Sequence, residues 1–480
     1  MLTMFPVGYH IVALNVPEIV IQDEMKNQSF LSSEGIFSSA ALNIAWSSII
    51  AALAFGAFIG CFFVTPTIQK FGVRISMVYV NNSICIFGSL LLFLSKYIMI
   101  TSMLLCGRVV IGIYVGMACA LSALFIKEIA TQKQKGTLGC CLHITVCLGS
   151  AVAGILSLPS FLGNQTYWNI LLAIPMIVSI IQMIMGRYMH ETPGYLFDNR
   201  KIAEGIESIK YYYGIDELSI EETVKEYSRE VSHVPSQIDW KTAYNNSAIR
   251  NGIKMGILVN IAQVFTGAMS AAAYSTNIFK SVSFNDSLTP YLPAIGSLIS
   301  VLVTLPGMYL IEQYGRRKLI LGTLAVCTAG NFSMLIFSII TQYDKVAYWA
   351  TSIFTISFIL MGLSYNIGIG PLAYFVPEEL VQAEAASIAL GAAVAANWVT
   401  TMFTNLLYYP LNDAFGGYSF LLFLIPSSYF LYYFYYNLKE TKGNFNSTGE
   451  RNLACNLLED IKEDTLNYQT FSKSQSVSSA

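Results

Sequence analysis

Long apolar stretches separated by short polar breaks run through almost the whole chain. In the first half they cover residues 2–21, 41–66, 75–95, 98–126, 137–160 and 168–189, and in the second half 252–279, 290–311, 319–341, 346–376, 386–408 and 418–437. About 20 apolar residues of helix cross a hydrocarbon core about 30 Å thick. Because lipid offers no hydrogen bonds to a backbone, such segments must be helical. The pattern predicts an all-α polytopic membrane protein with twelve transmembrane helices.

The composition agrees with this prediction and excludes several kinds of protein. Of the 480 residues, 54% are hydrophobic and only 12% are charged, whereas soluble domains carry about 25% charged residues. A net charge of −2 offers no surface for nucleic acid. The sequence contains no CxxC pair, HExxH helix, phosphate-binding glycine loop or GxSxG turn. We therefore expect no enzyme, no metal and no cofactor, with the lipid bilayer and a small solute as partners.

The polar segments divide the chain into two bundles, a linker and a tail. We expect residues 1–189 to form an N-terminal six-helix bundle and residues 251–438 to form a C-terminal one. Residues 190–250 carry 7 Lys or Arg and 11 Asp or Glu with amphipathic stretches, which predicts a helical linker in water. Residues 439–480 are polar and rich in Ser and Asn, so we expect a largely disordered tail.

The first predicted helix is short for a transmembrane segment. Only 16 residues precede Pro17, and at 1.5 Å per residue they extend about 24 Å, less than the roughly 30 Å of the hydrocarbon core. The opening also lacks the basic flank of a secretory signal peptide. We therefore expect that the first helix is truncated and that a segment precedes Met1 in the natural chain.

Basic residues gather in the loops on one side of the predicted bundles. The loops after helices 2, 4 and 8 hold Lys70, Arg74, Lys127, Lys133, Lys135, Arg316, Arg317 and Lys318, and the loops on the other side hold Lys26, Lys96, Lys280 and Lys345. Positively charged loops remain in the cytoplasm. We therefore expect cytoplasmic termini and linker, and the plasma membrane as the location. The sequons at Asn27, Asn164 and Asn285 then lie outside and are glycosylation candidates.

The two halves share a short motif. It reads IGCFFVTPTIQKFGVR at 59–74, after the second helix, and PGMYLIEQYGRR at 306–317, after the eighth. The two copies lie about half a chain apart, which indicates a duplicated six-helix unit. Transporters built from such repeats place their solute site near the midplane between the halves. We therefore expect two pseudo-symmetric bundles with a site between them.

An ordered series of further motifs resembles one family of transporters. It includes GYHIVALNVP at 8–17, GRVVIGIYVG at 107–116, HETPGYL at 190–196, YSTNIF at 274–279, GIGPLAYF at 368–375 and KETKG at 439–443. At these residues the chain resembles the sugar porter branch of the major facilitator superfamily, and within it the facilitative hexose transporters. The resemblance extends over nearly the whole chain and implies the major facilitator fold in a divergent member.

The resemblance also implies a set of substrate-binding residues. They are His143, Gln263, Gly267, Asn366, Tyr374, Asn397 and Trp398. Amides satisfy the hydroxyls of a sugar and an aromatic face covers its apolar side. Here His143 replaces a glutamine, Asn366 a glutamate and Tyr374 a tryptophan of the family pattern. Because an unpaired hydroxyl costs roughly 1 to 3 kcal/mol, we expect weak binding of glucose.

Two ionisable residues inside predicted spans, His10 and Arg108, are candidates for a central role. Charges in lipid are costly and usually face a cavity. By resemblance, His10 occupies a position where proton-coupled sugar porters carry an acid and uniporters an amide. Either His10 titrates during transport, or it stays neutral and forms a hydrogen bond; a nearby Arg108 favours the neutral form.

Charged residues at the cytoplasmic helix ends form two corresponding sets. Arg74, Glu128 and Lys135 belong to the first half, and Glu312, Arg316, Arg317 and Glu379 to the second. Exposed ion pairs contribute only about 0 to 1 kcal/mol each, so we expect a gate that closes and opens during transport rather than a stabilising role. The alternative is that these charges only set the topology. By resemblance, Ala386 replaces an arginine near Glu379, so we expect Glu379 to lack its partner.

The leading hypothesis is a carrier that moves a hexose or related small polar solute by alternating access, as facilitated diffusion. Two alternatives remain open. One is a carrier for a less polar solute, such as a dehydroascorbate-like, urate-like or drug-like molecule, which would suit Val264 and Met269 in the cleft. The other is a non-transporting sugar sensor, because a fold alone does not decide a function.

Overall fold

Every regular element in the described part of the chain is a helix. The computed structural model describes residues 2–31, 39–129, 135–213, 240–282, 284–285, 287–344, 347–374, 376–381 and 385–441. Nine helical stretches in these residues are long and apolar enough to cross a membrane, and one of them, Ala386–Asn437, contains two helices. Two shorter apolar helices, Leu2–Val12 and Cys141–Leu156, complete the expected set. The predicted all-α membrane fold is confirmed.

Six apolar segments form the N-terminal half. They are α1 (Phe5–Val12), α3 (Ser39–Phe71), α4 and α5 (Val73–Ile75 and Asn81–Leu94), α6 (Ile100–Ile129), α7 (Lys135–Leu156) and α8 (Trp168–Met185). α4 continues into α5 through a π-helical turn, Ser76–Val80. A separate helix, α2 (Glu18–Leu31), follows α1. Within this half α3 packs along α6, and α5 packs between α6 and α8.

Six apolar segments also form the C-terminal half. They are α13 with α14 (Ser247–Phe265 and Ala268–Ser281), α15 (Leu292–Tyr314), α16 (Arg316–Tyr343), α17 with α18 (Tyr348–Ile367 and Ile369–Leu372), α20 (Ala386–Phe415) and α21 (Leu421–Asn437). The short α19 (Val376–Glu379) precedes α20. Three helices of the linker are described: α9 (Pro193–Asp198), α10 (Ile202–Tyr213) and α12 (Trp240–Asn245). Linker residues 214–239 and tail residues 442–480 lie outside the described part.

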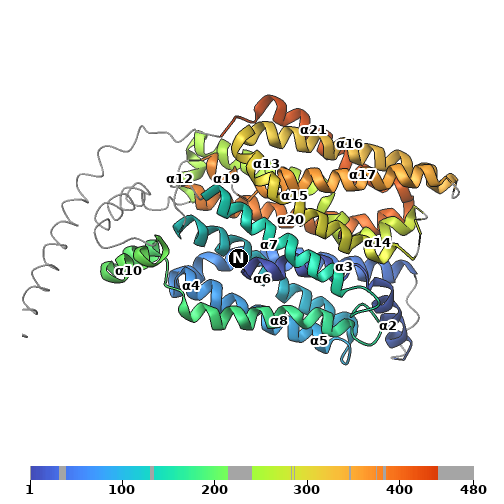
Figure 1. Cartoon of the computed structure of the whole chain (residues 1–480), viewed down its shortest axis with the longest axis horizontal. Helices are drawn as coiled ribbons and strands as arrows, with labels where there is room; N and C mark the ends of the chain where they lie inside the picture. Colours follow the sequence, from blue (N-terminus) through green and yellow to red (C-terminus); the bar gives the residue numbers. More distant parts are fainter. Residues whose placement is uncertain are drawn as a thin grey trace, which may run out of the picture.

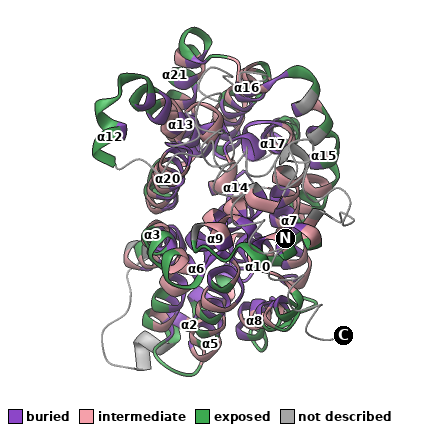
Figure 2. Cartoon of the chain, turned by 90° about the vertical axis from the view of Figure 1, so that its left-hand side faces the viewer, coloured by how far each residue is buried: buried purple, intermediate pink, exposed green. Residues whose placement is uncertain are grey.

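The two halves lie side by side with their helices running roughly along the long axis (Figure 1). We call the end that carries α10 and α12 the linker end, and the end that carries α2 the far end. The halves meet where α3 packs on α20 and α7 packs on α15. Seen from the linker end, buried residues gather inside each half (Figure 2). Apolar side chains such as Phe62, Ile184, Leu302 and Ile425 are exposed on the outside, where a membrane protein contacts lipid.

Several expected helices are interrupted where the backbone cannot continue. The first was expected to run over 2–21, but α1 ends at Val12 and α2 starts at Glu18, because Pro17 has no N–H to donate to a preceding turn. The seventh breaks at Gly267, whose φ of +84° separates α13 from α14. The tenth breaks at Gly368, which separates α17 from α18. The apolar pattern does not reveal these breaks, because each flanking segment is apolar.

Hydrogen bonds at the far end connect the two halves. Asn15, in the turn after α1, donates through Nδ2 to Oγ of Ser275 at 2.6 Å and accepts the N–H of Thr276 at 3.0 Å. Asn43 on α3 donates to the Asp413 carboxylate on α20 at 2.9 Å. These contacts hold α1 and α3 against α14 and α20. They close the far end in this structure.

Close packing of α3 on α6 in the N-terminal half involves two facing glycines. A Cβ atom added to Gly56 on α3 would lie 2.1 Å from the carbonyl oxygen of Val109 on α6, and one added to Gly112 would lie 2.3 Å from that of Leu53. Real Cβ atoms do not approach a carbonyl oxygen so closely, so the backbones would have to separate. Small residues at such a crossing let membrane helices approach closely.

We expect Gly112→Val to destabilise the N-terminal half by about 1 to 3 kcal/mol or more, as overpacking does in other interiors. The melting temperature of the purified protein in detergent measures this effect. The matched control is Gly322→Val on α16, because a Cβ added at Gly322 meets nothing within 4 Å. Equal melting temperatures for the two variants would contradict the packing argument.

Candidate functional site

A cavity of about 190 Å³ lies between the two halves. Helices α1, α6 and α7 line it from the N-terminal half, and α13, α14, α15, α17 and α20 line it from the C-terminal half. One water needs about 10 to 15 Å³ by this measure, so the cavity has room for several waters or one small solute. None of the described residues that line it is Asp, Glu, Lys or Arg. The cavity therefore suits an uncharged polar solute.

Asn366 on α17 organises the polar contacts on one side of the cavity. Its Nδ2 donates to the carbonyl oxygen of Gly362 at 2.7 Å and to Oγ of Ser300 at 3.0 Å. Its Oδ1 lies 3.0 Å from Nε2 of His143 and accepts from the Cys147 thiol at 3.5 Å. These contacts join α7 of one half directly to α15 and α17 of the other.

Gln263 on α13 organises the other side. Its Nε2 donates to the Tyr365 hydroxyl at 3.0 Å and to the carbonyl oxygen of Gly370 at 3.1 Å, while its Oε1 accepts from Nδ2 of Asn397 at 2.6 Å. Asn397 also donates to the carbonyl oxygen of Asn260 at 3.1 Å. The amide of Gln263 is thus bonded to the protein through both its nitrogen and its oxygen, and Asn397 is bonded through its nitrogen. A solute that bonds to these same atoms must replace the hydrogen bonds that they already make.

The structure brings most of the predicted substrate-binding residues together. Those that line the cavity are His143, Gln263, Asn366, Tyr374, Asn397 and Trp398. Gly267 is not among the lining residues; it forms the break between α13 and α14 and faces Asn331 and Phe423. Its positive φ, rather than contact with a solute, explains a glycine there.

The sequence analysis missed many of the residues that line the cavity, and Cys147 and Tyr365 are two that make polar contacts there. Cys147 lies one helical turn after His143 on the same face of α7, and Tyr365 lies beside Asn366 on α17. The i, i+4 spacing from His143 was a signal for Cys147. Tyr365 offered no such signal. It is adjacent to Asn366, and adjacent residues of a helix project in different directions, yet both line the cavity.

His10 and Arg108 lie close together but away from the cavity lining. Arg108 on α6 is 1% exposed, and its Nη1 donates to the carbonyl oxygen of His10 at 2.7 Å. Its Nε donates to the carbonyl oxygen of Ile49 on α3 at 3.4 Å. The expected hydrogen bond of the His10 ring is not found: neither ring nitrogen has a partner among the described residues. Arg108 therefore ties three helices together through main-chain carbonyls.

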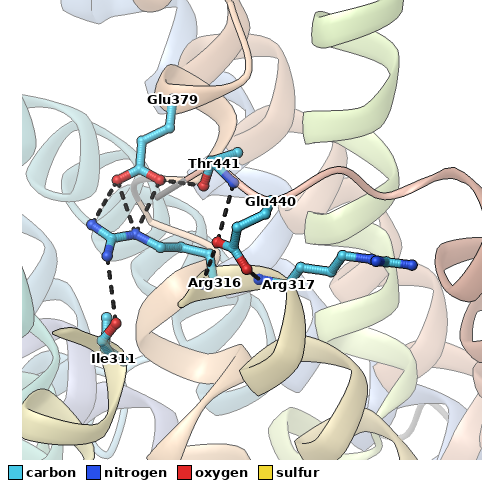
Figure 3. Close-up of polar contacts among 6 residues, drawn as sticks. All are labelled: Ile311, Arg316, Arg317, Glu379, Glu440 and Thr441. Atoms are coloured by element: carbon cyan, nitrogen blue, oxygen red, sulfur yellow. Dashed lines mark hydrogen bonds and ion pairs between the residues drawn. The ribbon is translucent and has the colours of Figure 1, made fainter. Parts of the chain in front are cut away.

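A cluster at the linker end joins three elements of the C-terminal half (Figure 3). The Arg316 guanidinium pairs with the Glu379 carboxylate, with Nη2 3.0 Å from Oε1, and Thr441 donates its hydroxyl to the same carboxylate at 2.6 Å. The expectation that Glu379 lacks a partner is wrong. Sequence reasoning considered only the position of Ala386, whereas the fold supplies Arg316 from the start of α16.

A second carboxylate, Glu440, caps the first turn of α16. It accepts the backbone N–H of Arg316 at 2.8 Å and that of Arg317 at 3.2 Å, groups that have no partner within the helix. The Arg317 side chain instead donates to the carbonyl oxygen of Tyr435 on α21 at 2.8 Å. Glu440 was not among the predicted gate residues, although KETKG had been recognised as a motif.

The N-terminal half repeats this arrangement. Glu191 accepts the backbone N–H of Arg74 at 2.7 Å, and Arg74 donates through Nη1 to the carbonyl oxygen of Met189 at 2.6 Å. The preceding glycines, Gly72 and Gly315, have nearly the same φ of +84° and +85°. Burial raises the pKa of the Glu191 carboxyl, and the N–H of Arg74 opposes that shift. The two HET and KET segments thus have the same role in the two halves.

The other predicted gate residues are only partly described. Glu128 lies half-buried near the end of α6. Lys135 begins α7 and Glu312 lies on α15, but both side chains lie outside the described part. Of the sequons, Asn27 is exposed on α2, and Asn285 and Asn164 lie in the loops after α14 and α7. Both Asn164 and Asn285 accept a backbone N–H of their own loop.

The profile of the sugar (and other) transporter family matches residues 1–450. The chain belongs to this family. This chain is therefore a carrier and not an enzyme, and it is an integral membrane protein. Both conclusions agree with the predictions from its apolar helices and from its lack of enzyme motifs.

Two facilitated glucose transporters resemble this chain over most of its length. It is 28% identical to the dog facilitated glucose transporter member 3 of solute carrier family 2 over 447 residues, 92% of this chain and 88% of the relative. The rat protein of the same name is 27% identical over 446 residues, with the same shares covered. Both relatives are named as facilitated glucose transporters.

Solved structures show the same fold. The partially occluded, inward-open xylose transporter XylE from E. coli aligns with a TM-score of 0.74 and 17% identity, over 93% of this chain and 97% of XylE. XylE bound to 6-bromo-6-deoxy-D-glucose, described as a proton:xylose symporter of the major facilitator superfamily, aligns with a TM-score of 0.70 and 18% identity, over 92% and 95%. The expected major facilitator fold is confirmed.

We expect Glu440→Ala to destabilise the C-terminal half by about 0.5 to 2 kcal/mol, the usual cost of losing a helix cap. Glu191→Ala should have a similar effect on the N-terminal half. Thermal unfolding in detergent measures both. Glu204→Ala is the control, because Glu204 forms only an exposed i, i+3 pair with Lys201. If all three variants unfold at the same temperature as the unchanged protein, Glu440 and Glu191 do not stabilise their halves as helix caps.

Proposed function

We propose that the sugar transporter carries a hexose or a closely related neutral polyol across a membrane by alternating access, as facilitated diffusion. The observation that carries this proposal is the cavity between the halves, whose described lining contains amides and aromatic side chains and no Asp, Glu, Lys or Arg. Amides can donate and accept hydrogen bonds from hydroxyls without attracting ions. Relatives named as glucose transporters support the hexose class.

Facilitated diffusion rather than proton coupling is supported by the surroundings of Arg108. A coupled carrier requires a group that gains and loses a proton along the solute path. The described lining residues include no carboxylate, and the imidazole among them, His143, is held with Nε2 3.0 Å from Oδ1 of Asn366. Arg108 donates to main-chain carbonyls, and neither it nor the buried His10 lines the cavity.

We also propose an orientation of the chain in the membrane. The linker end carries Arg74, Arg316 and Arg317, so the positive-inside rule puts it in the cytoplasm together with both termini. The plasma membrane is the proposed location, and the sequons at the far end then face outside. Of these, Asn27 and Asn285 are the preferred glycosylation sites, because both are exposed, whereas Asn164 is half-buried.

The charged residues at the linker end contribute little to a gate between the halves, because their described contacts lie within one half. The described pairs connect residues of the same half: Arg316 with Glu379, and Arg74 with Glu191. We propose that they keep the helix ends of each half together as a unit, while the far-end contacts of Asn15 and Asn43 hold the halves closed on the outside. Transport then requires the far-end contacts to separate.

A less polar solute is a second candidate. Much of the cavity lining is apolar, including Ile11, Met269, Phe358 and Val394, and Gln263 is already bonded to Tyr365 and Asn397. A solute with few hydroxyls would leave this network intact. Competition between hexoses and such solutes distinguishes the two candidates.

Uptake of a radiolabelled hexose into proteoliposomes tests the proposed function. We expect saturable uptake that does not depend on an imposed proton gradient. Asn397→Ala should reduce the apparent affinity about tenfold, because losing a hydrogen bond to a polar solute costs about 1 to 3 kcal/mol. Asn405→Ala is the matched control, since Asn405 is also a buried amide of α20 but does not line the cavity.

Uptake is normalised to the amount of folded protein, measured by size-exclusion chromatography. If no hexose or polyol is taken up, the proposed function is wrong. If Asn405→Ala lowers the affinity as much as Asn397→Ala does, the cavity is not where the solute binds.

A further inference from the structure

Three amides on one side of the cavity donate to main-chain carbonyl oxygens, and these contacts fix the direction in which each amide points. Asn260 on α13 donates through Nδ2 to the carbonyl oxygens of Gly256 at 3.3 Å and Ala373 at 3.0 Å. A carbonyl oxygen can only accept a hydrogen bond, so the amide nitrogen must face both partners. The amide oxygen of Asn260, Oδ1, therefore faces away from them.

The same argument fixes the other two amides. Nε2 of Gln263 donates to the carbonyl oxygen of Gly370 at 3.1 Å, so the amide oxygen Oε1 of Gln263 is the atom that faces Asn397. Nδ2 of Asn397 must then be the donor. It bonds to that Oε1 at 2.6 Å and to the carbonyl oxygen of Asn260 at 3.1 Å. Both amide hydrogens of Asn397 are therefore used.

Two acceptors remain on this side of the cavity: Oδ1 of Asn260 and Oδ1 of Asn397. Neither oxygen bonds to a described residue, because the bonds of both side chains go through Nδ2. Neither is among the completely buried polar atoms that lack a partner in the described part of the chain. Both oxygens are therefore accessible, and both residues line the cavity, although their residues are only 3% and 8% exposed. A solute in the cavity can contact them without replacing a bond within the protein.

The amide nitrogens of the described lining, by contrast, are all engaged. Asn260, Asn397 and Gln263 each donate to two acceptors of the protein. Asn366 on the other side of the cavity does the same. The amides thus offer a solute acceptors and no donor. The donors that remain in the described lining are the indole N–H of Trp398 and hydroxyl groups, and hydroxyls can also accept.

We propose that Asn260 and Asn397 select neutral polyols, because a solute must bring hydroxyl groups that donate to their two Oδ1 atoms. Carbonyl and ether oxygens can only accept, so a solute that offers nothing else leaves both oxygens unpaired. A site that bonds a substrate hydroxyl discriminates strongly against analogues that lack it. This inference rests on the proposed function, because it assumes that the solute occupies the cavity. It narrows the solute class to hydroxyl donors and adds Asn260 as a residue that determines specificity.

A series of deoxy and deoxyfluoro analogues of glucose, in which each hydroxyl is replaced in turn, tests this inference. Binding is measured by thermal stabilisation of the purified protein in detergent. Fluorine is close to a hydroxyl in size but donates no hydrogen bond. At a position that faces either Oδ1, both analogues should bind about tenfold more weakly than glucose, because both leave that oxygen unpaired. The inference is overturned if no position shows this loss, or if fluorine restores the affinity of glucose at every sensitive position.

The Asn260→Leu variant shows whether a sensitive hydroxyl bonds to Asn260, because leucine is similar in size and has no acceptor. The preference for glucose over one deoxyfluoro analogue should fall about tenfold, since that analogue has no bond to lose. Asn405→Leu is the matched control: Asn405 is a buried amide of α20 outside the cavity lining, so every preference should persist. If Asn260→Leu leaves every preference unchanged, the role of Asn260 is overturned. If this variant does not fold, the analogue series on the unchanged protein still decides the inference.

Binding and uptake together separate this inference from the proposed function. Thermal stabilisation does not require transport. If the analogues bind in the expected pattern but no hexose enters proteoliposomes, the proposed function fails and the inference is supported. If glucose is taken up but every deoxyfluoro analogue binds as tightly as glucose, the inference is overturned and the proposed function stands.

Discussion

A buried polar side chain in a membrane protein is costly unless it finds hydrogen-bond partners within the protein, and the contacts around the cavity between the two halves follow from this constraint. Unsatisfied groups in hydrocarbon cost several kcal/mol each. Asn366 satisfies all of its donors and its acceptor with partners from α7, α15 and α17. Gln263 bonds through both its nitrogen and its oxygen, and its partners are Tyr365, Gly370 and Asn397. The buried guanidinium of Arg108 bonds to main-chain carbonyls.

This constraint also shapes how a solute can bind. Because the cavity amides already bond to one another, a sugar gains only the difference between its new hydrogen bonds and those that it replaces. Modest affinity suits a carrier. A solute that binds the outward-open and inward-open states equally does not shift the equilibrium toward either of them. The far-end bonds of Asn15 and Asn43 connect the halves, whereas the carboxylates Glu191 and Glu440 cap helices within their own half.

The fold was largely predictable from sequence, because lipid permits only helices in a chain of this pattern. The breaks at Gly267 and Gly368 were not predictable, because an apolar stretch does not show where the backbone changes its φ and ψ angles. Resemblance to a family identified the main amides of the cavity, Gln263, Asn366 and Asn397, but not Cys147 and Tyr365, which bond to them. The pairing of Glu379 with Arg316 depends on how α16 meets α19. Such contacts between segments distant in sequence cannot be obtained from local patterns.

The structures of the two halves resemble each other more closely than their sequences do. Gly72 and Gly315 share an unusual backbone conformation, and each is followed by a helix whose first N–H groups bond to a carboxylate from the end of the same half. The repeated motif had indicated a duplication. Only the structure shows that Glu191 and Glu440 complete it.

A cryo-EM structure of the protein prepared in a saturating concentration of its transported hexose tests the central claim most directly, because that claim places the solute between the halves. The account predicts density for the sugar inside the cavity, within hydrogen-bonding distance of Gln263 and Asn397. An empty cavity, or sugar density bound elsewhere on the molecule, would contradict it.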